Sequence, residues 1–126
     1  MKYIWLFICF AIPGVCFTSC NEKAVTVDSE IYIHLQGGFN DNDVKVSIDG
    51  NQVYHKQHIT TNNLLGLADV DSTLQQNGDH SIRVDIDSTI TYVQSFTLQN
   101  TIWCGINLNP NDSTVFIFSD EKFLYD

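Results

Sequence analysis

Residues 44–51 read Val44-Lys45-Val46-Ser47-Ile48-Asp49-Gly50-Asn51, and this stretch decides how the chain folds. Apolar and polar side chains alternate from Val44 to Asp49, which is the period of a β-strand with one buried face. The Asp-Gly pair follows, and both residue types accept the positive φ that a tight hairpin turn requires. The stretch therefore predicts a strand, a two-residue turn and a return strand over residues 52–59.

The same alternation continues on both sides of this hairpin. Further strands are predicted at residues 31–36, 70–74, 80–86, 90–98, 101–108 and 115–118, with Gly, Asn and Asp between them. No segment of useful length has the period of a helix. The fold class is therefore all-β: an antiparallel β-sandwich of about seven to eight strands. Residues 64–68 fit either a short strand or one helical turn, and residues 123–126 are apolar enough to add to a sheet edge.

Two of these stretches resemble immunoglobulin-like sandwiches of bacterial surface proteins. Residues 44–50 are similar to a strand that enters a hairpin, and residues 78–84 to a turn that begins a core strand. The resemblance implies an immunoglobulin-like arrangement of the sheets. It implies no activity, because this architecture carries many unrelated functions.

The first twenty residues have the layout of a signal peptide. Lys2 precedes an apolar run over residues 3–15, which is too short for a permanent membrane-spanning helix but suits secretion. The stretch Phe17-Thr18-Ser19-Cys20 resembles the lipobox of bacterial lipoproteins, in the loosened form found in Bacteroidota. The resemblance implies cleavage before Cys20 and acylation of its thiol. Two or more acyl chains give a stable membrane anchor.

This interpretation divides the chain into a signal peptide (1–19), a lipidated cysteine with a short tether (20–30) and a β-sandwich domain (31–126). It places the protein in a bacterial envelope, at the outer membrane. Two alternatives stay open: cleavage by an ordinary signal peptidase near Ser19, which would release a soluble exported protein, and an uncleaved anchor.

Charge and cysteine content limit the function further. The chain has 15 acidic and 6 basic residues, a formal charge of −9, which disfavours nucleic acid as a partner. Of its four cysteines, Cys9 and Cys16 would leave with the signal peptide and Cys20 would carry lipid. Cys104 alternates with apolar neighbours, so we expect a small buried side chain rather than a nucleophile.

Aromatic residues give the strongest lead toward a ligand. Tyr32, Trp103, Phe116 and Phe118 lie outside the clearest inward-facing pattern or on a strand that is apolar on both faces. They either pack in the core or form a flat platform for a sugar or a protein partner. Both interpretations stay open from the sequence.

The tripeptide Asp-Ser-Thr occurs three times, close to predicted turns. It resembles the O-glycosylation acceptor of exported Bacteroidota proteins, and the resemblance implies Ser72, Ser88 and Ser113 as acceptors. The alternative is that Asp and Ser are simply common in turns.

The sequence offers no catalytic triad, metal signature or cofactor motif. His55 and His58 are three residues apart on a predicted strand, so without a bulge they point to opposite faces and cannot share a metal ion. We therefore expect a non-catalytic structural or interaction domain that needs no cofactor. The alternative is a carbohydrate-binding lipoprotein of a glycan-uptake system.

Overall fold

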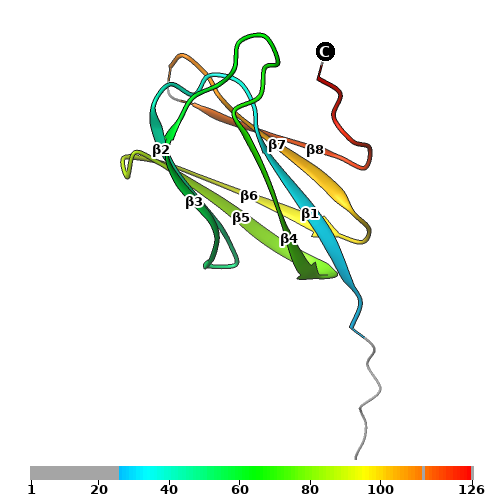
Figure 1. The fold of residues 1–126 in the computed structure, drawn as a ribbon. Helices are drawn as coiled ribbons and strands as arrows, with labels where there is room; N and C mark the ends of the chain where they lie inside the picture. The colour runs from blue at the N-terminus through cyan, green and yellow to red at the C-terminus, as the bar shows by residue number, and fades with distance from the viewer. Residues whose placement is uncertain (1–25, 112, 126) are drawn as a thin grey trace, which may run out of the picture.

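A computed structural model describes residues 26–111 and 113–125 (Figure 1). The predicted signal peptide and Cys20 lie outside these residues. Within them, no helix is long and apolar enough to cross a membrane.

The described chain forms eight β-strands, and each predicted strand is present. They are β1 (Asp28–Leu35), β2 (Asn42–Ile48), β3 (Asn51–Ile59), β4 (Asp69–Gln76), β5 (Gly78–Ile86), β6 (Ile90–Leu98), β7 (Ile102–Leu108) and β8 (Thr114–Ser119). β1 begins three residues before the expected start of the domain, and the buried Ser29 donates a hydrogen bond to Asn77 there.

The strands make two four-stranded sheets that pack face to face (Figure 1). The first sheet has the order β4-β1-β7-β8 and the second has the order β3-β2-β5-β6. The predicted all-β sandwich is thereby confirmed. All neighbouring strands are antiparallel except β1 and β7, which are parallel. The chain crosses from β6 to the first sheet before β7, so β7 can join β1 in the same direction.

The core lies between the two sheets and comes mainly from the four central strands. The side chains with the least exposure are Ile31, Ile33, Leu35, Val44, Val46, Ile48, Ile82, Val84, Ile86, Leu98, Cys104 and Ile106. Burying an aliphatic side chain of this size stabilises the fold by about 1.5–3 kcal/mol. The expected burial of Cys104 is confirmed, and burial raises the pKa of its thiol to about 12.

The tight turn predicted at Asp49 and Gly50 is confirmed. Both residues have positive φ, 51° and 83°, and their neighbours Ile48 and Asn51 pair directly. The turn between β5 and β6 is similar, with positive φ at Asp87 and Ser88. Positive φ at both central residues matches the twist of a hairpin.

One local alternative is resolved and one expectation needs correction. Residues 64–68 follow the turn and not the strand: the backbone N–H of Gly66 donates to the carbonyl oxygen of Asn62, which is the spacing of a helical turn, and a bridge between Asn62 and Leu67 closes it. Residues 123–125, the described part of the C-terminal stretch, do not add to a sheet edge. Instead, the rings of Phe123 and Tyr125 lie against His34, on the central strand β1.

Candidate functional site

The outer faces of the two sheets differ in character. The second sheet is polar outside: Arg83 and Thr91 both donate hydrogen bonds to the carboxylate of Asp85. The first sheet is more apolar outside, because several of the residues that alternate with its buried positions are hydrophobic. Its exposed aliphatic side chains are Val70 (42%), Leu74 (59%), Val115 (41%) and Ile117 (45%).

A hollow of about 430 Å³ opens on this apolar face. Tyr32 of β1 and Trp103 of β7 are paired across the parallel strands, and their rings stack at a centroid distance of 5.3 Å and an angle of 11°. Val70 and the C-terminal tail complete the wall. Because the two rings stack on each other, they do not lie side by side as a flat row.

The C-terminal tail is held over this face by side-chain hydrogen bonds. The hydroxyl of Tyr125 lies 2.8 Å from Nδ1 of His34 and accepts a hydrogen bond of 2.8 Å from Gln36. Asn107 in turn donates to the side-chain oxygen of Gln36. Gly105 leaves the space that Gln36 occupies, since a Cβ at position 105 would lie 2.4 Å from that oxygen.

The contacts of the tail suit a neutral His34. The Tyr125 hydroxyl accepts from Gln36 and keeps its own proton, which it can donate to Nδ1 of a neutral imidazole. Burial lowers the pKa of His34, and the nearby Lys122 lowers it further. Burial raises the pKa of Tyr125, which keeps the hydroxyl proton in place.

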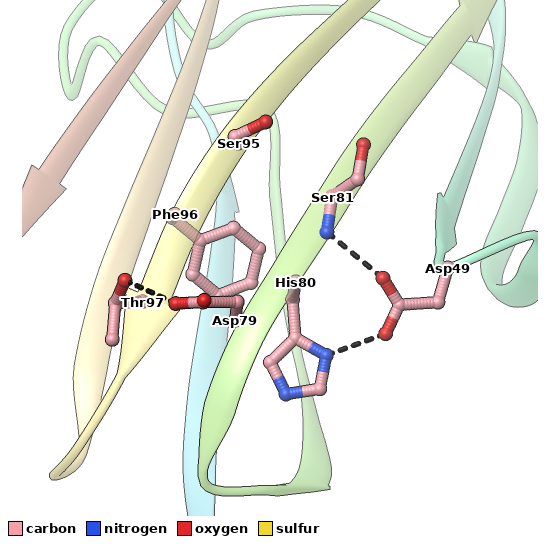
Figure 2. A pocket seen from close by; sticks show the side chains of 7 residues that line it. All are labelled: Asp49, Asp79, His80, Ser81, Ser95, Phe96 and Thr97. Carbon is pink, nitrogen blue, oxygen red and sulfur yellow. Dashed lines mark hydrogen bonds and ion pairs between the residues drawn. The ribbon is translucent and has the colours of Figure 1, made fainter.

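A second hollow lies beside the turns at one end of the second sheet (Figure 2). There Nδ1 of His80 is 2.5 Å from the carboxylate of Asp49, and that carboxylate also accepts a hydrogen bond from the backbone of Ser81. Nε2 of His80 is 2.5 Å from the carbonyl oxygen of Gln76. Both partners of the ring can only accept, so His80 must donate from both nitrogens and is an imidazolium.

The hydrogen bonds of His80 leave neither ring nitrogen free to accept a proton in the second hollow. A general base needs a free nitrogen, and both nitrogens of His80 are occupied. The Ser81 and Ser95 side chains also lie away from the imidazole ring (Figure 2). The carbonyl of Gln76 and the Asp49 carboxylate raise the pKa of His80, and the His80 contact lowers the pKa of Asp49. The pair therefore acts as a charged cross-link between two turns.

The four aromatic residues singled out from the sequence do not form one group. Tyr32 and Trp103 meet on the outer face of the first sheet. Phe116 and Phe118 point the opposite way and pack, half-buried, against the core. Phe118 stacks on Phe96 of the second sheet at 5.2 Å, so it closes one side of the sandwich.

The three serines of the Asp-Ser-Thr tripeptides occupy different settings. Ser88 is exposed in the turn between β5 and β6. Ser113 precedes β8, and its hydroxyl donates to Asn111. Ser72 is exposed in the middle of the edge strand β4, away from a turn.

His55 and His58 lie on a strand that does carry a bulge. The register of β3 with β2 shifts between Asn42 and Val44, and His58 has a φ of 60°. Each histidine pairs with its own carboxylate at 2.7 Å, His55 with Asp43 and His58 with Asp41. Over residues 26–111 and 113–125, no three His, Cys, Asp or Glu side chains form a group that could hold a metal ion.

Sequence reasoning missed the polar residues that hold the tail at the first hollow. Tyr125 lies 91 residues after His34 and 89 after Gln36, and none of the three belongs to a motif. The alternation around Ile33 does place His34 on the outer face, but no local signal shows what covers it.

Comparisons with known proteins give no relative for this chain. No protein-family model, no curated protein and no solved structure matched it. The fold therefore defines the class, a β-sandwich of two four-stranded sheets, and any function rests on the described surface.

Proposed function

We propose that this chain is a lipoprotein of a bacterial envelope, anchored at the outer membrane through Cys20, with an immunoglobulin-like sandwich that serves as a non-catalytic interaction module. The apolar outer face of the first sheet carries this proposal. Exposed aliphatic side chains on β4 and β8 flank the stacked Tyr32 and Trp103 around the first hollow. Exposed apolar side chains that gather on one face of a sheet mark contact sites for other proteins.

The interaction role is tested by placing a photo-crosslinking amino acid on each outer face in cells that express the protein. Val70 lines the first hollow, and Val93 is a similarly exposed valine on the outer face of the second sheet. We expect discrete crosslinked products from position 70 and not from position 93. Equal products from both positions, or none from position 70, would remove the proposal.

The anchor is tested separately with a Cys20→Ala variant. Mass spectrometry of the unaltered protein should find acyl chains on a mature form that begins at Cys20, and the variant should leave the membrane fraction. A mature form that begins elsewhere would contradict the lipoprotein assignment.

Carbohydrate binding is the second candidate, because aromatic rings line the first hollow. It ranks second because flat sugar platforms need rings side by side, whereas Tyr32 and Trp103 stack on each other. A glycan array probed with the unaltered protein and with Trp103→Ala separates the two functions. Binding of defined glycans that is lost in the variant would favour carbohydrate binding.

Ser72, Ser88 and Ser113 remain proposed glycosylation acceptors, which peptide mass spectrometry would identify.

A further inference from the structure

The sandwich has two open sides, and each is formed by one edge strand from each sheet. On one side β3 and β4 are joined by Asp69, which accepts hydrogen bonds from Tyr54 at 2.7 Å and Lys56 at 2.9 Å. On the other side β6 and β8 are joined by the stacking of Phe96 on Phe118. One side is therefore polar and the other aromatic.

The β3 and β4 edges carry features that prevent further strands from pairing. The register of β3 shifts at two places, and the strand contains Lys56 and two histidines. β4 contains Asp69 and Asp71, which lie opposite Leu35 and Ile33 of β1 and so point toward the core side. Bulges and inward-pointing charges are the usual means of blocking a sheet edge.

The edges of β6 and β8 lack both features. Neither strand contains a charged residue, and each pairs with its neighbour without a register shift. β8 is the more apolar: Val115 and Ile117 are exposed on the outer face, while Phe116 and Phe118 are half-buried on the other. β6 instead presents Thr91, Ser95 and Thr97 outward beside Val93. An apolar edge with open backbone groups is a template for an added strand.

We propose that the free edge of β8 binds an extended, basic segment of a partner protein as a fifth strand of the first sheet. The proposal deepens the interaction role proposed above and rests on it. Backbone groups along the edge select an extended segment, and alternating apolar side chains of that segment would cover the exposed face of β8.

Charge indicates that the segment is basic. The chain carries a formal charge of −9, and the exposed Asp120 and Glu121 directly follow β8. A lysine-bearing strand would be attracted to this end of the edge. A second copy of the chain carries the same −9 and would be repelled, which disfavours self-pairing through this edge.

The probe for this edge is a synthetic ten-residue peptide that alternates valine and lysine, added to the full-length protein in non-ionic detergent. Two control peptides carry glutamate in place of lysine, or one proline at the centre. The matched variants are Ile117→Lys and Val93→Lys. Both replace an exposed aliphatic residue on the outer face of an edge strand, Ile117 in the first sheet and Val93 in the second, and both change the net charge equally.

We expect the lysine peptide to bind the unaltered protein and Val93→Lys within twofold of each other. Ile117→Lys should bind at least tenfold more weakly, and both control peptides should bind at least tenfold more weakly to every form. Equal losses in the two variants, undiminished binding of the proline peptide, or no binding of the lysine peptide would overturn the proposal.

Amide hydrogen exchange tests the proposal on the unaltered protein, so its result does not depend on whether a variant folds. Adding the lysine peptide should slow exchange along β8 and leave β4 unchanged, whereas protection along β4 or β6 alone would overturn the proposal. The two proposals can fail separately. If position 70 gives crosslinks in cells but the lysine peptide does not protect β8 from exchange, the interaction role stands and strand addition is wrong.

Discussion

Nδ1 of His34 lies 2.8 Å from the hydroxyl of Tyr125, which is 91 residues further along the chain. This contact holds the last described residue against the central strand β1 and closes one wall of the first hollow. The shape of the proposed contact surface therefore depends on a hydrogen bond between the two ends of the domain.

Replacing Tyr125 with phenylalanine should loosen the tail without changing its apolar packing. The hydroxyl takes part in two hydrogen bonds, so we expect the free energy of unfolding to fall by about 1–2 kcal/mol. Urea titration of the full-length protein in detergent measures it. Tyr32→Phe is the control, because among the described residues no hydrogen bond of the Tyr32 hydroxyl is seen; an equal loss in the control would count against the tail contact.

His34 should make the fold less stable as the solution becomes acidic. Its pKa is lowered below 6.5 in the folded state, so below pH 6.5 the unfolded chain takes up a proton there while the folded chain does not. The free energy of unfolding should therefore fall as the pH drops below 6.5. In His34→Gln, urea titrations at several pH values should show a weaker fall; an unchanged slope would refute this assignment.

His80 should have the opposite dependence on pH. Its pKa is raised above 6.5 by Gln76 and Asp49, so its contribution is fully present below pH 6.5 and is lost as the pH rises through the folded-state value. The contribution of Asp49, whose pKa is lowered, is present above pH 3.8 and lost in stronger acid. We expect His80→Gln to reduce the loss of stability on the alkaline side of pH 6.5. Asp49→Asn should also reduce the loss of stability above pH 6.5. If the two variants changed this loss in opposite directions, the cross-link would be contradicted.

Gly38 and Gly50 offer a test of backbone packing. Both have positive φ, 89° and 83°, so alanine at either position costs about 1–2 kcal/mol in backbone strain. A Cβ at position 38 would also lie 1.6 Å from the carbonyl oxygen of Leu108, whereas position 50 is open. We expect Gly38→Ala to lower the free energy of unfolding by at least 1 kcal/mol more than Gly50→Ala, as overpacking does. Equal losses in the two urea titrations would show that the loop moves freely away from Leu108.

The sequence predicted the strands well because the signal for a strand is local. Alternation around Val44, Val46 and Ile48 depends only on which face of a pleated strand meets the core. The turn at Asp49 and Gly50 likewise depends on the φ values that two residues accept. For the same reason Cys104 could be placed in the core from its apolar neighbours alone.

The candidate site could be predicted only in part. Tyr32 and Trp103 were recognised as residues outside the inward pattern, but Phe116 and Phe118 share that appearance and lie on the other side of β8. What separates the two pairs is the register of β8 against β7, which sets Phe116 and Phe118 opposite the buried Ile106 and Cys104 and which no alternation within β8 records.

The sequence by itself determined an all-β chain, the positions of its strands and the turn at Asp49 and Gly50, since each follows from the conformational preferences of a few adjacent residues. Only the tertiary structure decided that β1 and β7 run parallel, that Tyr125 rests on His34 and that β6 and β8 share the side without charges. The inward-facing side chains of these strands are similar rows of aliphatic residues. Many different strand orders would therefore satisfy the alternation of apolar and polar residues within each strand. The packing of the whole core selects one of them.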